Sequence, residues 1–412
     1  MPLPLRLHDA REQKRAVTGL HCWVRSVRAS KELTFLTVYD GSTRDDVQVV
    51  YRGRLAPKPA LHQAVTLDLA WRDELVADDV RYAALDDAAG GAAYPMAKKE
   101  MPVAHLRRHP DERVRTRTIQ SIQRASSELA WATHDFFRQR GFEWVRTPVL
   151  TGEDCEGAGE QFSVAGAADF FGRDMSLTVS GQLDLEKQVV GGLGRGYTFG
   201  PTFRAEKSHT RRHLAEFWMV EPEAVMDTLE QLMDLAEDYV SHCHRPCAQR
   251  GGSRRFARVS YTDAVAALQD DRWPDLAWGD DLGSEQEMRL CALHGGRPTF
   301  VHHYPRALKS FYMRDTREDE PAGRETVECM DLLVPGVGEL VGGSMREEDG
   351  ARLRRKMADR GMALAQYASY LQTRGRVSVP HGGFGLGFER LVKWVAGADH
   401  IRDTIPYPRV AK

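Results

Sequence analysis

The stretch FRAEKSHTRRHLAEFWMVEPE, residues 203–223, has a charged start, a polar loop and an apolar run at Phe217–Val220. Arg204 and Glu206 are two residues apart, so on a strand both side chains would lie on the same face. The polar loop is typical of a turn that returns the chain to a second strand. The stretch therefore predicts a β-hairpin that brings a guanidinium and a carboxylate together.

The stretch HGGFGLGFERL, residues 381–391, combines four glycines with the start of a helix. Glycine has no side chain, so a ligand can approach the backbone closely at these positions. Glu389 and Arg390 then open an apolar pattern with helical spacing from Leu391 onward. We expect the two stretches to form the halves of one adenine-nucleotide site, with one arginine from each half.

The two stretches resemble motifs 2 and 3 of class II aminoacyl-tRNA synthetases, and RGFEWVRTPVL at residues 140–150 resembles motif 1 of that family. The stretches between them resemble asparaginyl-tRNA synthetases in particular: DCEGAGEQF, SGQLDLE, TFGPTFRAE, MDLLVPGVGELVGGSMRE and IRDTIPYPR. The resemblance runs from about the first strand to the C-terminus. It implies an α+β fold, with an N-terminal OB-fold β-barrel and a catalytic domain whose antiparallel sheet is flanked by helices.

Length, charge and cysteine content limit the classes of protein to which this chain could belong. The chain has 412 residues, which suits two or three domains, with 57 basic and 59 acidic side chains. An RNA partner would therefore contact a local basic patch rather than a globally basic protein. The six cysteines are scattered, and the start MPLPLRLHDAREQKR has neither a leader pattern nor a long apolar span. We expect a cytoplasmic protein with no membrane partner.

Residues 1–93 contain short strand candidates separated by turn-like segments, as in a small barrel. The candidates are Val17–Arg28, Leu33–Tyr39, Asp46–Tyr51, Ala64–Trp71 and Val80–Leu85. A run of small residues, DDAAGGAA, then marks a linker. We expect an OB-fold domain similar to anticodon-binding domains at 1–93, a linker at 94–118 and a class II catalytic domain at 119–412.

The strand candidate Leu33–Tyr39 has apolar residues on both faces, so alternation leaves open which face is the core. In the anticodon-binding barrels of related synthetases, an aromatic residue at the position of Phe35 stacks on an anticodon base. The resemblance implies this role for Phe35, with Arg28 and Gln48 beside it, and such stacking contributes about 1–3 kcal/mol per base. A core position for Phe35 is the alternative.

Residues 119–140 repeat apolar side chains every three or four positions, as on an amphipathic helix, and Gly141 suits its C-terminal end. In class II synthetases a long helix here and a following strand that ends in a proline, here Pro148, build the dimer interface. The resemblance therefore implies a homodimer formed through motif 1.

The reaction of this family joins an amino-acid carboxylate to the α-phosphorus of ATP, so fixed cations must stabilise the charge on the phosphates. By resemblance, Arg204 contacts the α-phosphate and the reacting carboxylate. Glu206 contacts the adenine amino group, Phe217 stacks under the adenine, and Arg390 stacks over it near the γ-phosphate. Arg204 and Arg390 are therefore the expected catalytic residues.

At the phosphate end, the resemblance implies that Arg212 and His213 approach the terminal phosphate of ATP. Asp331 and Glu339, eight residues apart, resemble the carboxylates that bind Mg²⁺ in this family, and Glu339 would also contact ATP. Carboxylate and phosphate oxygens are the ligands that a hard divalent cation prefers. ATP and Mg²⁺ are therefore the expected cofactors.

At the amino-acid end, Glu156 and Glu221 match family positions that bind the ammonium group, and Gln182 matches a pocket wall residue. Aspartyl relatives have a lysine at position 185, whereas this chain has Leu185, which removes the cation that would pair with a substrate carboxylate. Glu186 would accept from an amide NH₂ group.

The side-chain oxygen of the substrate would contact Arg346, which matches an arginine in both relatives. Asparagine is therefore favoured over aspartate, although Asp184 and Leu185 stand where asparaginyl relatives have Asn and Ala. The product would be asparagine esterified to the 3'-terminal ribose of tRNA(Asn). Two alternatives stay open: a paralogue that activates asparagine or an analogue, or charges tRNA, for a specialised pathway, and a non-catalytic RNA-binding paralogue.

Overall fold

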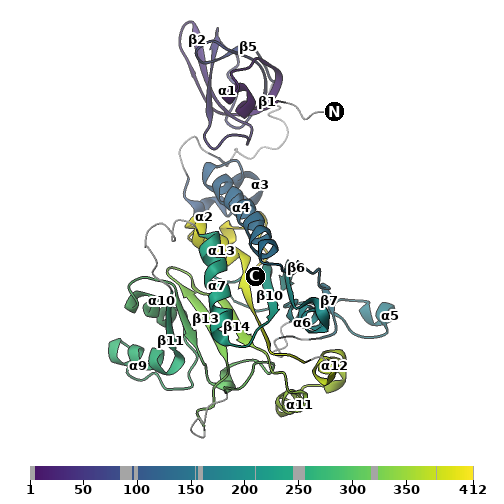
Figure 1. The fold of residues 1–412 in the computed structure, drawn as a ribbon. Helices are drawn as coiled ribbons and strands as arrows, with labels where there is room; N and C mark the ends of the chain where they lie inside the picture. The colour runs from purple at the N-terminus through teal and green to yellow at the C-terminus, as the bar shows by residue number, and fades with distance from the viewer. Residues whose placement is uncertain are drawn as a thin grey trace. The chain divides into compact units, whose positions relative to one another are not determined.

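The computed structural model describes residues 5–83, 95–96, 101–153, 155, 161–208, 210–244, 256–316, 323–376 and 378–411. The chain divides into two compact units, Met1–Ser121 and Ile122–Lys412 (Figure 1). The division into three parts with boundaries at 93 and 118 stays a prediction.

The first unit contains a closed five-stranded barrel with the strand order β1-β2-β3-β5-β4, which confirms the predicted OB-like barrel (Figure 1). The strands are β1 Val17–Ala29, β2 Leu33–Tyr39, β3 Val47–Arg52, β4 Ala64–Trp71 and β5 Leu75–Arg81. Helix α1, Leu7–Glu12, buries Leu7 and Ala10 in the barrel core. The core otherwise consists of the inward-facing apolar side chains of the strands, as expected for alternating patterns.

The predicted fifth strand, Val80–Leu85, is wrong in its position, because β5 spans Leu75–Arg81. Strands β4 and β5 are joined by a tight turn in which Asp73 has a φ of +64°. The charged residues of this turn and of β5 hid the strand from a search for apolar alternation. Residues 84 and 85 of the predicted strand lie outside the described residues.

Along the sequence, three helices follow the barrel strands: α2 Val103–Leu106, α3 Pro110–Arg113 and α4 Arg117–Gln139. Helix α4 confirms the helix predicted over residues 119–140. It is followed by Gly141, whose φ of +72° is a conformation that glycine adopts without strain.

The second unit is built on an eight-stranded sheet with the order β11-β12-β13-β14-β15-β10-β9-β6. Every pairing from β12 to β9 is antiparallel, whereas the edge strands β11 and β6 pair in parallel, so the predicted antiparallel sheet is mixed at its edges. The strands are β6 Glu143–Trp144, β9 Arg195–Phe203, β10 Glu216–Val225, β11 Ala257–Ser260, β12 Thr299–His302, β13 Cys329–Val334, β14 Gly338–Met345 and β15 His381–Gly387. A separate hairpin pairs β7 Leu150–Thr151 with β8 Ser176–Leu177.

Helices flank this sheet, as predicted. Helix α7 packs across β13, β14 and β15, α13 packs against β10 and β15, and α6 packs against β9 and β10 (Figure 1). The helices of this unit after α4 are α5 Ala167–Phe171, α6 Gln182–Gln188, α7 Leu229–Cys243, α9 Tyr261–Asp271, α10 Ser284–Leu293, α11 Gly350–Asp359, α12 Ala368–Arg376 and α13 Phe388–Ala396. Within the described residues, no helix combines the length and the apolar character needed to span a bilayer.

Candidate active site

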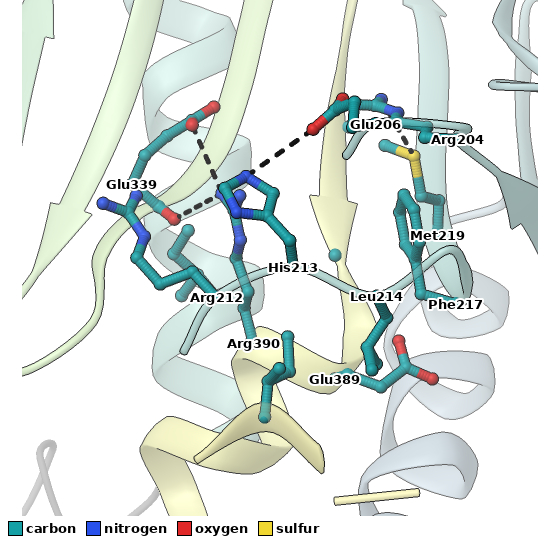
Figure 2. Close-up of a pocket in the computed structure, with 14 residues that line it drawn as sticks. Arg204, Glu206, Arg212, His213, Leu214, Phe217, Met219, Glu339, Glu389 and Arg390 are labelled. Atoms are coloured by element: carbon teal, nitrogen blue, oxygen red, sulfur yellow. Dashed lines mark hydrogen bonds and ion pairs between the residues drawn. The ribbon is translucent and has the colours of Figure 1, made fainter. Parts of the chain in front are cut away.

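One pocket of the second unit collects all seven residues predicted to bind ATP (Figure 2). Its lining residues are Arg204, Glu206, Arg212, His213, Leu214, Phe217, Met219, Glu339, Leu340, Gly385, Gly387, Glu389, Arg390 and Ile401. Arg204 and Arg390, which are far apart in the chain, therefore line the same cavity. The two sequence stretches that contain them meet because β10 pairs with β9 on one side and with β15 on the other.

Strands β9 and β10 form the predicted hairpin, but β9 ends at Phe203, so Arg204 and Glu206 lie in the loop rather than on a strand face. The stem of this loop is closed by a hydrogen bond of 3.0 Å from the Arg204 backbone N–H to the Ala215 carbonyl. The Arg204 guanidinium carbon lies 5.5 Å from the centre of the Phe217 ring. A cation and an aromatic ring therefore border the same side of the pocket.

The glycines of β15 keep the sheet surface open beneath the site. A Cβ atom at Gly385 would lie 2.7 Å from Met219 Cε, and one at Gly383 would overlap Glu223 and the Pro222 carbonyl oxygen. Side chains alternate along a strand, so Phe217, Met219, Glu221 and Glu223 share one face of β10. The pocket and the two acidic residues are therefore on the same side of the sheet.

Charged side chains that hold one another in place form the other wall. The Arg390 Nη1 donates to the Glu339 carbonyl at 2.9 Å and lies 3.2 Å from Glu339 Oε2 (Figure 2). The Arg212 guanidinium pairs with Glu287 of α10 at 3.0 Å, so this helix fixes its direction. His213 Nε2 lies 3.7 Å from Glu206 Oε2. Burial, helped by the neighbouring guanidinium of Arg390, lowers the pKa of His213, which favours its neutral form.

Asp331 and Glu339 converge on one point above the sheet. A Cβ atom placed on Gly342 would lie 3.2 Å from Glu339 Oε1 and 3.5 Å from Asp331 Oδ1. The second oxygen of Asp331 accepts from Lys309 Nζ at 2.6 Å. Burial alone would lower the pKa of Lys309, but attraction to Asp331 and Glu339 outweighs it and holds the pKa above its ordinary value.

The carboxylate pair fits a divalent cation that shares its ligands with a bound triphosphate, because one oxygen of each carboxylate faces the same point and both are hard donors. Among the residues described, no group of three or more His, Cys, Asp or Glu side chains suitable for a metal ion is found. A cation here would therefore need further oxygen ligands from phosphate or water.

Among the residues predicted to bind the amino acid, Glu221 is hydrogen-bonded to the residues just before α6. Its Oε2 accepts from the Gly181 N–H at 2.9 Å, and its Oε1 accepts from the Ser180 hydroxyl. Gln182 Nε2 is buried and has no hydrogen-bond partner in the described part of the chain. A buried donor without a partner is costly, so this amide suits a site that a ligand completes. The predicted partner Glu156 lies outside the described residues.

Leu185 and Glu186 of α6 are both fully buried, but their surroundings differ. Leu185 Cδ1 packs on β9 beside Gly196, where a Cβ atom would be 3.0 Å away. Its predicted place in the wall of the amino-acid pocket stays a prediction.

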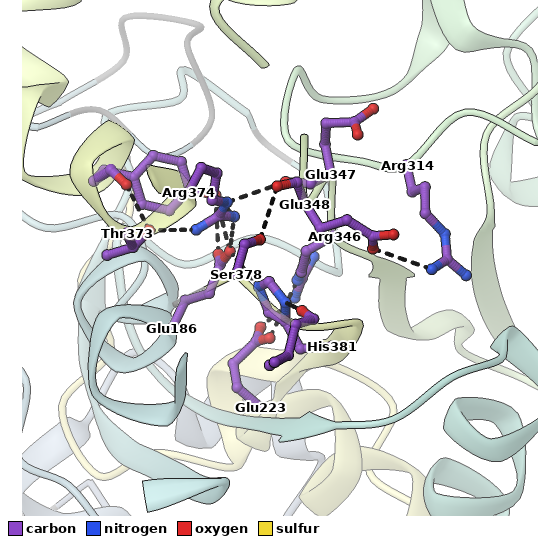
Figure 3. Close-up of polar contacts among 12 residues, drawn as sticks. Glu186, Glu223, Arg314, Arg346, Glu347, Glu348, Thr373, Arg374, Ser378 and His381 are labelled. Atoms are coloured by element: carbon purple, nitrogen blue, oxygen red, sulfur yellow. Dashed lines mark hydrogen bonds and ion pairs between the residues drawn. The ribbon is translucent and has the colours of Figure 1, made fainter. Parts of the chain in front are cut away.

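The carboxylate of Glu186 is surrounded by donors from distant segments. It pairs with Arg374 of α12, accepts from the Tyr370 hydroxyl at 3.0 Å and lies 2.8 Å from His381 Nε2 (Figure 3). Burial alone would raise the pKa of Glu186, but the charge of Arg374 and the hydrogen bond with His381 outweigh it and hold the pKa well below its ordinary value.

Arg346 forms a second buried ion pair, and its partner is a residue that the sequence interpretation missed. The guanidinium donates to Glu223 and, at 2.8 Å, to the Ser344 hydroxyl (Figure 3). Burial alone would lower the pKa of Arg346, but Glu223 outweighs it and raises that pKa. A signal for Glu223 was present, because it follows Glu221 by two residues and must share its strand face.

The barrel places the three predicted anticodon residues on one outer surface. Thr34, Leu36 and Val38 are buried in the barrel core, so the face that alternation left open is settled, and Phe35 is half-buried on the outside. Phe35 pairs with Arg28 across β1 and with Val50 across β3. Gln48 is exposed two residues before Val50, which puts it on the face of Phe35.

An antiparallel sheet with one arginine from a hairpin loop and another from a helix entrance in a common pocket, together with a five-stranded barrel, defines a class II aminoacyl-tRNA synthetase. Residues 106–411 match the family tRNA synthetases class II (D, K and N), and the chain belongs to this family.

Individual relatives and solved structures show which members of the family this chain is similar to. The chain is 39% identical to the asparagine–tRNA ligase of Thermosynechococcus vestitus, over 94% of each chain. It is 40% identical to the asparagine–tRNA ligase of Desulfotalea psychrophila, over 98% of this chain and 97% of the relative. Its structure is similar to that of asparaginyl-tRNA synthetase from Pyrococcus horikoshii complexed with asparaginyl-adenylate, with a TM-score of 0.87, 28% identity and coverage of 100% and 99% of the two chains.

Proposed function

We propose that this chain is an ATP-dependent ligase that activates asparagine and esterifies it to the 3'-terminal ribose of tRNA(Asn). The observation that carries the proposal is the single pocket lined by Arg204 and Arg390, on the sheet face that continues to Glu223 and Arg346. A nucleotide and an amino acid bound along this face would have their reacting ends side by side.

In the first step, a carboxylate oxygen of asparagine attacks the α-phosphorus of ATP, and the bond to the bridging oxygen breaks to release pyrophosphate. Phe217 would stack on the adenine, and Glu206 would accept from its amino group. Arg204 would bind the α-phosphate and the attacking carboxylate, and Arg390 the far end of the triphosphate. These groups act by positioning and by fixed charge, so no protein nucleophile is needed.

The phosphate end would be completed by Arg212, by neutral His213 and by a metal ion. Asp331 and Glu339 would hold Mg²⁺, which when bound supplies positive charge to the phosphate oxygens. Glu287 supports this end from outside, because its carboxylate holds Arg212 and accepts from the Glu339 backbone N–H at 3.2 Å.

We propose that Arg346 and Glu223 together select the carboxamide of asparagine. A guanidinium can donate to the amide oxygen while the adjacent carboxylate accepts from the NH₂ group. This role was predicted for Glu186, but the Glu186 carboxylate already contacts Arg374, Tyr370 and His381. Aspartate would instead bring a second carboxylate against Glu223 in a buried site, which is strongly unfavourable. Gln182 would add a donor to the bound amino acid, and Glu221 and Glu156 would serve its ammonium group.

The function is tested by ATP–pyrophosphate exchange with asparagine and with aspartate, followed by acylation of purified tRNA. We expect exchange that depends on asparagine, and at least about 100-fold weaker exchange with aspartate because of the buried charge. Equal exchange with both amino acids would contradict the proposed selection. Exchange without acylation of any tRNA would contradict the ligase function.

We propose that the outer barrel face of Arg28, Phe35 and Gln48 binds the anticodon. Phe35→Ala is expected to raise the KM for tRNA by about tenfold or more, because stacking contributes roughly 1–3 kcal/mol per base. Pyrophosphate exchange, which needs no tRNA, should be unchanged. Thr37→Ala, on the same face of β2, is the matched control. An unchanged KM for Phe35→Ala would exclude this face.

We also propose a homodimer through motif 1. Three exposed tryptophans lie near one another: Trp131 of α4, Trp144 of β6 and Trp218 of β10, with exposed fractions of 69%, 52% and 41%. The ring of His134 lies 5.1 Å from Trp144 and 5.4 Å from Phe199, which lies 5.1 Å from Trp218. A group of exposed aromatic side chains of this kind is typical of a protein interface.

We further propose the cytoplasm as the compartment. None of the five described cysteines forms a disulfide, which suits a reducing environment. Loss of activity of the purified enzyme in a reducing buffer would contradict this assignment.

A further inference from the structure

Lys309 has no role in the proposed reaction, yet it is fixed at the metal-binding carboxylates. It follows a short 3₁₀ turn, Arg306–Leu308, and its carbonyl accepts from Arg360 Nη2 at 2.7 Å. Its Nζ lies 3.9 Å from the centre of the Tyr304 ring and 2.6 Å from Asp331 Oδ2. The Arg360 hydrogen bond thus anchors the Lys309 backbone, and the Tyr304 ring borders the ammonium group where it contacts Asp331.

The same arrangement occurs on the other carboxylate. Glu339 directs Oε2 to Arg390 at 3.2 Å, while its Oε1 and Asp331 Oδ1 both lie within 3.5 Å of the Cβ position of Gly342. The order across the site is thus cation, carboxylate, open point, carboxylate, cation. Two carboxylates directed at one point repel each other, and Lys309 and Arg390 balance that charge.

This balance has a consequence for metal binding. The four groups sum to no net charge, so a divalent ion alone would leave the site with an excess of two positive charges near Lys309 and Arg390. A triphosphate supplies the negative charge that removes this excess. We propose that Lys309 is a resident counter-cation that prevents the carboxylate pair from binding a divalent metal until the nucleotide is present, an inference that rests on the proposed function.

The test measures binding of Mn²⁺ to the full chain by electron paramagnetic resonance, with no ATP present. Lys309→Met removes the charge and leaves the carboxylates, so the nucleotide-free variant should bind Mn²⁺ about tenfold or more tightly than wild type. Lys309→Arg keeps the charge and should bind as weakly as wild type. The double variant Lys309→Met, Asp331→Asn should lose the gain, which assigns it to this site.

A second experiment measures the stability of the protein instead of the amount of bound metal. Lys309→Met leaves Asp331 buried without its cation, so its unfolding midpoint should fall, and added Mn²⁺ should restore it without shifting wild type. If Lys309→Met does not fold, Lys309→Gln, which can still donate to Asp331, serves for both measurements.

The outcomes separate the two levels of the proposal. Mn²⁺ binding by Lys309→Met as weak as that of wild type, or a gain that survives removal of Asp331, would overturn the role of Lys309. Wild type should bind Mn²⁺ together with a non-hydrolysable ATP analogue. Failure of that uptake would overturn the metal site itself, and with it the inference.

Discussion

Arg390 is the residue on which the proposed nucleotide site depends most directly. Its guanidinium is held by the Glu339 carbonyl and carboxylate, so its direction is fixed before ATP binds. Arg390→Ala should reduce pyrophosphate exchange by about 10²–10³-fold, as expected for loss of one fixed donor to a developing charge. Arg272→Ala, at the exposed end of α9, is the control and should have full activity. Full exchange activity of Arg390→Ala would exclude the assigned pocket.

Glu389 precedes Arg390 in the chain, and its burial leads us to expect that the stability of the protein depends on pH. Burial raises the pKa of Glu389 to about 7, although its carboxylate accepts from the Trp218 N–H at 3.0 Å. The folded protein thus binds this proton more tightly than the unfolded chain, and the free energy of unfolding decreases as pH rises from the ordinary value of 4.5 through about 7.

Glu389→Gln removes this cost and keeps an acceptor for the Trp218 N–H. The variant should be more stable than wild type at about pH 8.5, by up to about 3 kcal/mol, and equal to it at about pH 4. Urea unfolding at the two pH values measures the difference. A stability difference that does not change with pH would contradict the assigned titration.

Among the elements, β15 shows why its glycines are not equivalent. A Cβ at Gly385 meets only the flexible end of Met219, whereas one at Gly383 meets the Pro222 carbonyl oxygen and the buried carboxylate of Glu223. Gly385→Ala should cost about 1 kcal/mol, and Gly383→Ala about 3 kcal/mol or more, because backbone cannot move aside. Chemical denaturation of the two variants compares them directly. Equal costs would mean that β10 and β15 can shift against each other.

The sequence predicts some of these elements well, and physical reasons limit the rest. The hairpin of residues 203–223 has a local pattern, so it was predictable, although the loop position of Arg204 was not. The face of Phe35 was not predictable, because both faces of β2 are apolar and only barrel closure decides between them. The position of β5 was missed because its outward residues are charged.

The residues of the site were also predictable only where a local sequence pattern marks them. The residues that line the nucleotide pocket belong to motifs that resemble a known family, so they could be named from the sequence. Glu223 and Lys309 were missed because the roles proposed for them depend on partners, Arg346 and Asp331, that the fold brings to them from distant parts of the chain. Contacts between distant segments leave no periodic signal in the chain.

At the scale of the whole molecule, the exposed tryptophans predict the oligomeric state. Charges placed on the aromatic surface, as in Trp131→Glu combined with Trp144→Glu, should convert a dimer to a monomer, because charged groups are unfavourable in an apolar interface. Light scattering after gel filtration measures the mass. Phe170→Glu, which replaces an exposed aromatic residue on α5, is the control and should leave the mass unchanged. A dimer that persists in the double variant would place the interface elsewhere.

The residues on one face of β10 also have fixed spacings along the strand. Phe217 and Glu223 are fixed on one strand, about 20 Å apart at the usual rise of a strand, and neither can slide without breaking pairings on both sides. In the proposed function the aminoacyl-adenylate lies between these two residues, so the space left for the amino-acid side chain is fixed. Glutamine, longer by one methylene group, should be rejected by roughly 10–200-fold through size alone, which the ratio of kcat/KM values in exchange would report.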